Sequence, residues 1–321
     1  MSEVDRTIGS GRRVLVTGAT GFVGRGALEP LLALGYEVHA VSTRAAPGWS
    51  PAGVSWHRAD LLASADVVAE VAPSHLLHFA WDAEPGRFWT SEANLAWVSA
   101  SLALLSAFNA AGGERAVLAG TCAEYAWGDV THCVEATPAR AASTLVEERP
   151  TPLEPATLYG AAKHALHVLA AAHARQHDYA LAWGRIFFVF GPFEDERRLG
   201  GSVAAALAAG RTAETSPGDQ VRDFLYAPEL AEAFVALLGS PVTGAVNVAS
   251  GRPVAMKELI GALGEASGRP ELVALGARPA NAAEPSSLTA DVRRLRDEVG
   301  WSPSRSLGEA ARETMAWWSA R

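Results

Sequence analysis

Tyr159 and Lys163 stand four positions apart in the segment LYGAAKHA. On a helix this spacing puts both side chains on one face, with Cβ atoms ~5–6 Å apart. A tyrosine can exchange a proton with a reacting oxygen if nearby positive charge lowers its pKa from ~10. The spacing also fits an ordinary surface pair. Lysine usage favours the chemical interpretation, because 25 of the 27 basic residues are arginine and only Lys163 and Lys257 are lysine.

Thr121 is a third candidate, because it directly follows the apolar segment ERAVLAG. Enzymes built on parallel sheets place reactive groups at the carboxyl ends of strands. A hydroxyl at this point could hydrogen-bond a substrate oxygen beside Tyr159, although it could also cap a turn. We predict that Thr121, Tyr159 and Lys163 form the catalytic set.

Three glycines, Gly18, Gly21 and Gly24, follow the apolar segment RRVLV and precede a helix-like stretch. Glycines in a strand–turn–helix context permit a tight turn and a close approach of the backbone to a pyrophosphate at the helix N-terminus. A three-glycine match alone is weak, but its place at the start of an alternating fold favours a dinucleotide site over an ordinary turn.

The elements that carry these residues alternate along the chain. Apolar strand-like runs (12–16, EVHAVSTR, 75–80, 114–120 and 179–191) are separated by stretches with helical periodicity, including 93–113 and 157–177. This alternation predicts an α/β fold with a Rossmann-type, doubly wound parallel sheet and a smaller C-terminal α/β domain. We place a soft boundary near residue 190, which gives regions 1–190 and 191–321, and expect the chain to cross it. Segment 131–156 holds four prolines and is predicted to be a long loop.

Composition limits the classes of protein to consider. The 321 residues are 49% hydrophobic and 19% charged, with a net charge of −8, so phosphate-driven binding of nucleic acid is not expected. No uninterrupted apolar stretch reaches the ~18–20 residues of a membrane helix. The two cysteines, Cys122 and Cys133, have no metal-ligand spacing, so no metal site is predicted. These features indicate a cytoplasmic protein with a small ligand.

Taken together, these motifs identify a resemblance to a known family. Its members are the extended short-chain dehydrogenase/reductases that act on nucleotide sugars, and the resemblance covers roughly residues 12–318. The matching features are residues 17–24, Asp60, 78–80, Asn94, Thr121, Tyr159 with Lys163, RIFFVFGP (185–192), 222–224 and a GW-x-P tail.

The resemblance implies a role for each matching residue. The catalytic set is Thr121, Tyr159 and Lys163, and Arg222 matches the arginine that meets the substrate diphosphate. Residues 1–190 would bind the dinucleotide and 191–321 the nucleotide sugar. The implied cofactor-binding residues are Gly18, Gly21, Phe22, Val23, Gly24, Asp60, Leu61, Phe79, Ala80, Trp81 and Asn94.

Departures from the family pattern narrow the reaction. Sugar-nucleotide dehydratases carry Asp-Glu after the catalytic threonine, where this chain has Cys122 and Ala123, so dehydration is not expected. Cys122 is assigned to the substrate site, with a small buried residue as the alternative. Phe188 replaces a common asparagine and is also assigned to substrate binding. Four aromatic residues could stack on base or sugar, or lie in the core: Trp81, Phe88, Trp89 and Trp97.

The end of the second predicted strand bears on the cofactor. NAD enzymes place an acidic residue there for the ribose 2′-hydroxyl, whereas this chain has Ser42 and Arg44. An arginine can pair with a 2′-phosphate, so NADP(H) is favoured over NAD(H), unless Arg44 is only a solvated surface residue.

The sequence therefore predicts an NADPH-dependent ketoreductase most like those acting on the C4 keto group of an NDP-4-keto-6-deoxyhexose. An NAD-dependent NDP-hexose 4-epimerase with a retained cofactor is the first alternative. A non-catalytic dinucleotide sensor is the second, since fold does not imply function. The family resemblance also suggests a homodimer through helices 93–111 and 157–177.

Overall fold

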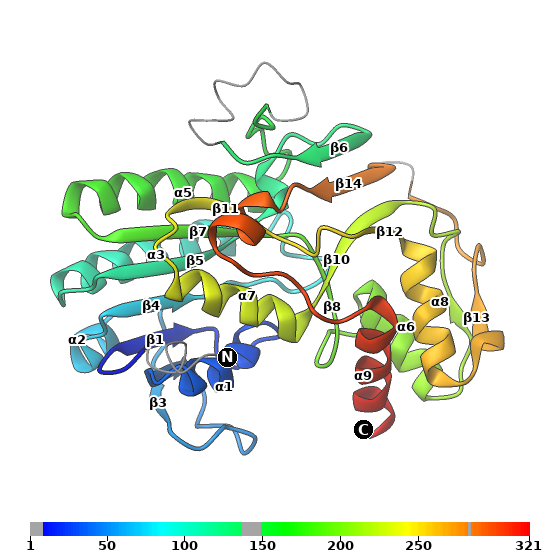
Figure 1. The fold of residues 1–321 in the computed structure, drawn as a ribbon, viewed down its shortest axis with the longest axis horizontal. Coiled ribbons are helices and arrows are strands. Elements are labelled where there is room, and N and C mark those ends of the chain that lie inside the picture. The colour runs from blue at the N-terminus through cyan, green and yellow to red at the C-terminus, as the bar shows by residue number, and fades with distance from the viewer. Residues whose placement is uncertain (1–8, 137–148, 282–283) are drawn as a thin grey trace.

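A seven-stranded parallel sheet forms the centre of the computed structural model, which describes residues 9–136, 149–281 and 284–321 (Figure 1). Its order is β11-β7-β5-β4-β1-β2-β3. The inner strands are apolar on both faces, as in a parallel sheet covered on both sides. The predicted α/β class and doubly wound sheet are confirmed. The strands are β1 (Arg13–Thr17), β2 (Glu37–Ser42), β3 (Val54–Arg58), β4 (His75–His78), β5 (Arg115–Thr121), β7 (Ala180–Ile186) and β11 (Gly244–Val248).

One face of this sheet is covered by α3 (Ala93–Ala110), α5 (Leu158–His177) and the short α2 (Val67–Val71). Phe108 of α3 and Leu166 of α5 join one buried cluster with Leu118 of β5. By length and hydropathy α3 could span a membrane, and it is the one helix in the described part of the chain of which this is true. It is the crossover between β4 and β5 and packs on α5 along one side, and 33% of this span is buried inside the protein.

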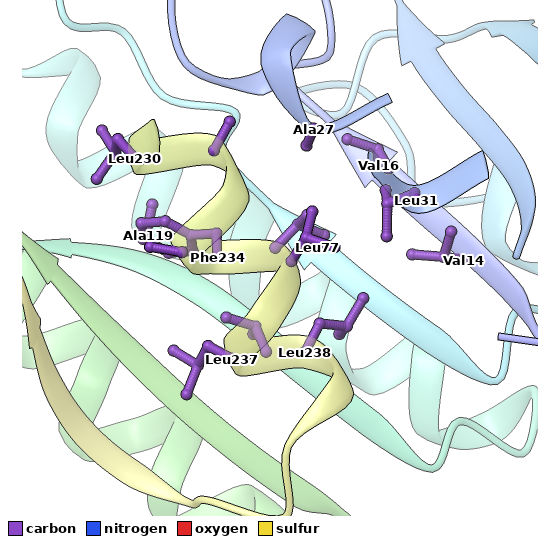
Figure 2. Packing of buried hydrophobic residues seen from close by; sticks show 14 of the residues in the cluster. Val14, Val16, Ala27, Leu31, Leu77, Ala119, Leu230, Phe234, Leu237 and Leu238 are labelled. Atoms are coloured by element: carbon purple, nitrogen blue, oxygen red, sulfur yellow. The ribbon is translucent and has the colours of Figure 1, made fainter. Parts of the chain in front are cut away.

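The opposite face is covered by α1 (Leu28–Ala33) and α7 (Ala227–Gly239). Figure 2 shows Phe234 of α7 packed over strands that carry Leu77 and Ala119. A 3₁₀ turn, Gly24–Ala27, precedes α1 and contacts α7. Pro30 lies in the first turn of α1, where its missing N–H costs no hydrogen bond within the helix.

A second, mixed sheet stands beside the first, in the order β12-β10-β14-β6, with β8 paired to β10 (Figure 1). Three helices and a small two-stranded sheet complete this region around a separate apolar cluster. Its elements are β6 (Val130–Cys133), β8 (Phe188–Phe190), β10 (Val221–Tyr226), β12 (Pro253–Ala255), β14 (Ser287–Ala290), β9 (Ala213–Glu214), β13 (Val273–Ala274), α6 (Leu199–Ala208), α8 (Met256–Ser267) and α9 (Leu307–Ser319).

Two boundaries differ from the expected ones. The run 179–191 divides into β7 and β8, which belong to different sheets because the chain leaves the central sheet at Phe187. The expected loop 131–156 begins with a strand, β6, that pairs with β14, while 137–148 lie outside the described residues. The division at residue 190 stays a prediction. The chain crosses it at least twice, since β11 returns to the central sheet and β6 joins the second one.

Candidate active site

The glycine turn sits at the carboxyl end of β1, where space is tight. Gly18 has φ +67°, and a Cβ there would lie 2.7 Å from the backbone nitrogen of Ala80. A Cβ on Gly24 would lie 2.4 Å from the carbonyl oxygen of Gly18. Side chains at these positions would therefore open the turn. The bare backbone that remains fits a pyrophosphate, the chemistry that the glycine spacing predicted.

A cavity of about 440 Å³ begins at this turn and runs along the carboxyl edge of the central sheet. Of the predicted site residues, the glycines, Phe22, Val23, Phe79, Trp81, Thr121, Cys122, Tyr159, Lys163 and Phe188 line it. Sequence analysis did not predict its outer wall, which includes Trp127, Ile186, Phe187, Val189, Glu194, Arg198, Leu199, Gly200 and Phe224. Ala80 and Asn94 are not among its lining residues. Neither are the four residues predicted to lie at the adenosine end of the cofactor, which are Ser42, Arg44, Asp60 and Leu61.

Thr121 and Tyr159 meet in this cavity. Thr121 ends β5, and Tyr159 stands in the first turn of α5, where the Thr157 side chain caps the helix by accepting from the Gly160 N–H at 3.1 Å. Burial raises the pKa of Tyr159 to about 12, while a hydrogen bond with the Thr121 hydroxyl acts in the opposite direction. The Tyr159 ring lies edge-on to Phe88, with centroids 4.8 Å apart. Its phenol is thus held beside one hydroxyl in an otherwise aromatic wall.

Lys163 is one turn further along α5 and 4% exposed. Its Nζ donates to the carbonyl oxygen of Ala119 at 2.9 Å and lies 3.7 Å from the ring centroid of Trp81. Burial lowers the pKa of Lys163 to about 7, with Glu124 opposing. The expectation that Lys163 lowers the pKa of Tyr159 is not met by this arrangement, in which burial dominates at the phenol and the ammonium faces Trp81.

Asn94 does not line the cavity, and its side chain has a positioning role instead. Its Oδ1 accepts from Trp81 Nε1 at 2.9 Å, and its Nδ2 donates to the carbonyl oxygens of Phe88 (2.7 Å) and Ser91 (2.8 Å). Both ends of the amide are therefore used within the protein. Asn94 fixes Trp81, which in turn lies under the Lys163 ammonium, while its predicted contact with the cofactor stays a prediction.

The residues expected at the adenosine end gather at the same sheet edge. Ser42 Oγ accepts from the Arg44 N–H at 3.0 Å, and the Arg44 side chain is exposed. The Ala59 N–H donates to the Ser42 carbonyl at 3.0 Å, which brings the exposed Asp60 and the buried Leu61 beside them. No carboxylate ends β2 itself. These contacts place the four residues together, and their binding roles stay predictions.

Three residues were expected at the substrate. Cys122 and Phe188 line the cavity, and burial raises the pKa of Cys122 to about 12, which removes this thiol as an acid or base near neutral pH. Arg222 is 3% exposed and stands behind Phe188, with its guanidinium 5.2 Å from that ring centroid. Arg222 Nη2 lies 3.4 Å from a carboxylate oxygen of Glu284. A diphosphate would have to compete with this ion pair.

Sequence reasoning also missed a buried ion pair beneath the site. Glu124 is fully buried; its Oε2 accepts from Arg185 Nε at 2.9 Å, and its Oε1 accepts from the Thr121 N–H at 2.9 Å and from Trp183 Nε1 at 2.8 Å. The pairing joins the 3₁₀ turn that follows β5 to β7 and, through His167, to α5, a contact that no local pattern could reveal. Glu124 also lies near two histidines of α5, His164 and His167. Arg185 supplies the positive charge there, so the donor set suits an ion pair rather than a metal ion.

The chain resembles known proteins in both sequence and fold. Residues 14–249 match the NAD dependent epimerase/dehydratase family. The chain belongs to this family. It is therefore an enzyme of the short-chain dehydrogenase/reductase type. The sensor interpretation is set aside.

Relatives of this enzyme share nearly its whole length. A UDP-glucose 4-epimerase from Rhizobium leguminosarum bv. trifolii is 28% identical, over 96% of this chain and 98% of that protein. The UDP-glucose 4-epimerase of Thermus thermophilus, solved with NAD, is 26% identical with a TM-score of 0.76, covering 95% of this chain and 98% of that one. The structure described as MoeE5 in complex with UDP-glucose and NAD is 29% identical, with the same TM-score and coverage.

Proposed function

We propose that this enzyme transfers hydride between a nicotinamide cofactor and a ring carbon of a nucleotide-linked hexose, most specifically C4. The observation that carries the proposal is the meeting of Thr121, Tyr159 and Lys163 in one cavity that begins at the glycine turn. Cys122 and Ala123 stand where a dehydratase would need carboxylates, so oxidoreduction is the chemistry best served by this set.

The protein's part in the step is proton transfer and orientation. Tyr159 donates its phenolic proton to the oxygen of the keto group as hydride reaches the carbon, and Thr121 hydrogen-bonds the same oxygen. A bound nicotinamide supplies the hydride and, once oxidised, a positive ring that favours the phenolate. The high pKa of Tyr159 keeps its proton in place until then, which suits a general acid better than a base.

The preferred direction is net reduction with NADPH. β2 ends in Ser42, and Arg44 is exposed two residues later, so the 2′ position of the adenosine ribose would meet a cation and no carboxylate from this strand. An enzyme that exchanges NADPH at each turnover fits reduction of an NDP-4-keto-6-deoxyhexose. Full-length similarity to UDP-glucose 4-epimerases supports a second candidate, epimerisation at C4 with retained NAD.

The released nucleotide separates these candidates. We would denature the purified enzyme, identify the nucleotide by mass, and measure NADPH and NADH affinities of the wild type and Arg44→Ala. Reduction predicts a site that prefers NADPH, with the preference falling about tenfold or more in the variant because a phosphate contact is lost. Near-stoichiometric NAD, with no effect of Arg44→Ala, would favour epimerisation.

The predicted homodimer belongs to this proposal as well. Leu95 of α3 and Val168 and Leu169 of α5 are 54%, 53% and 47% exposed, so these neighbouring helices present apolar side chains outward. We propose that a second copy covers them. The cytoplasmic location stays a prediction.

A further inference from the structure

Glu194 is a buried carboxylate that faces the cavity without a complete set of partners. It is 4% exposed, and its Oε2 is buried and accepts no hydrogen bond. Among the lining residues that the structure describes, it is the single carboxylate. A buried polar atom without a partner is unfavourable because it has given up its hydrogen bonds to water, and a ligand donor would remove that cost.

The backbone immediately before Glu194 is strained. Phe193 has φ +68°, a conformation that a bulky residue rarely adopts. Two contacts hold its ring: the Arg25 guanidinium, 3.7 Å from the centroid, and Trp317, with centroids 4.5 Å apart. An unfavourable backbone conformation is therefore kept immediately before the unpartnered carboxylate. Strain of this kind is common at functional sites.

The carboxylate rests against the first turn of α6. A Cβ on Gly200 would lie 2.4 Å from Glu194 Oε2, so glycine leaves the room that the carboxylate occupies. Backbone N–H groups of Gly191, Gly200 and Gly201 favour its charged form. None of these groups completes a hydrogen bond to Oε2, so this oxygen is still open to a ligand donor. A negative oxygen would repel the diphosphate, which leaves the sugar as the part of a nucleotide sugar that suits this position.

We propose that Glu194 is a substrate-binding residue whose Oε2 accepts a hydrogen bond from a hydroxyl or amino group of the nucleotide-linked sugar. This inference rests on the proposed function and names the sugar chemistry that the site recognises. Its contact selects a ring that carries a donor at this position over one that lacks it. An ammonium group would bind more strongly than a hydroxyl, because it also compensates the charge.

The protonation of Glu194 fixes the direction in which the affinity for the sugar should change with pH. Burial raises the pKa of Glu194 to about 8, against the opposing effects of Arg198 and the backbone amides. Only the ionised form accepts fully, so affinity for the sugar should increase as pH rises through 8. The other charged or titratable side chains that line the same cavity are Arg198 at the N-cap of α6, Tyr159 and Lys163 of α5, and Cys122. Arg25 lies on the outer side with Asp195, Glu196, Arg197 and Arg321.

The experiment measures binding of UDP-glucose, dTDP-glucose, the free diphosphates UDP and dTDP, and the methyl esters of these diphosphates by calorimetry between pH 6.5 and 9. The affinity of each sugar nucleotide is divided by that of the methyl ester of UDP or dTDP, because this diester, like the sugar nucleotide, does not titrate in this pH range, whereas the terminal phosphate of a free diphosphate does. We expect this ratio to increase about tenfold across the range in the wild type. Glu194→Gln should lower it at pH 9 and make it independent of pH, while Glu196→Gln, an exposed neighbour outside the cavity, should behave as the wild type.

Each result decides the proposal. A ratio that falls with pH would mean that protonated Glu194 donates to a ligand acceptor, and an unchanged ratio in a folded Glu194→Gln variant would mean no contact; both overturn it. The wild-type pH series needs no variant, so a Glu194→Gln protein that fails to fold leaves the test intact. Binding of the diphosphates without any gain from a sugar overturns this inference alone, whereas failure to bind any nucleotide also overturns the proposed function.

Discussion

Tyr159 is the residue on which the chemistry depends most directly. Its phenol lies beside the Thr121 hydroxyl, and burial keeps it protonated. We expect Tyr159→Phe to reduce turnover by ~10²–10⁴-fold, because the acid is lost while the aromatic wall remains. NADPH affinity, measured by fluorescence titration, should stay within about twofold. Tyr179→Phe removes a hydroxyl paired with His173 outside the cavity and should keep full activity.

The lowered pKa of Lys163 can be tested separately through the pH dependence of stability. Its pKa is about 7 in the folded enzyme and ordinarily 10.5, so the unfolded chain holds more protons between these values and stability rises with pH there. Lys163→Met should abolish turnover without lowering Tm at pH 7, because a buried cation is removed. The wild type should then gain stability relative to the variant as pH increases to 9.5. Thermal unfolding at both pH values measures this, and a constant difference would contradict the burial argument.

At the scale of elements, the Glu124–Arg185 pair joins the end of β5 to β7 beneath the site. Glu124→Gln leaves the Arg185 guanidinium buried without its anion, which should cost about 3–5 kcal/mol of unfolding free energy. Urea unfolding measures the loss, with the exposed Glu92→Gln as a neutral control. A loss below ~1 kcal/mol would show that the pair contributes little.

The same scale explains what sequence could and could not predict. The alternation of apolar runs predicted the α/β class and the parallel sheet, and the glycine turn and the Tyr159–Lys163 spacing are local patterns. Glu194 was missed because its importance depends on a strained neighbour and on a helix that begins five residues later. Asn94 was placed at the cofactor by resemblance, and only the packed structure shows that its amide is taken up by Trp81 and the backbone.

At the scale of the whole molecule, the outward apolar side chains of α3 and α5 predict self-association. Leu169→Glu puts a charge on this exposed surface, so we expect a shift from dimer to monomer with little change in Tm. Sedimentation velocity of the wild type and the variant at micromolar concentration measures it. A wild type that sediments as a monomer would contradict the dimer proposal and leave the active-site assignment unaffected.

Two sheets with separate cores meet at the cavity, and the site draws on both of them. The central sheet supplies the glycine turn, Thr121 and the elements that fix Tyr159, whereas β8, β10 and α6 supply Phe188, Phe224 and Gly200. Domain prediction from the chain alone could not show this, because the outer wall comes from segments that are far apart in sequence.

Hydride transfer itself is the most direct test of the account. We would incubate the enzyme with dTDP-4-keto-6-deoxyglucose or its UDP analogue and NADPH doubly deuterated at C4 of the nicotinamide, then locate deuterium in the sugar by NMR and mass spectrometry. The account predicts one deuterium at C4 of the sugar, formed by the wild type and not by Tyr159→Phe. A folded wild type that binds NADPH and the keto sugar but leaves the sugar free of deuterium would contradict it.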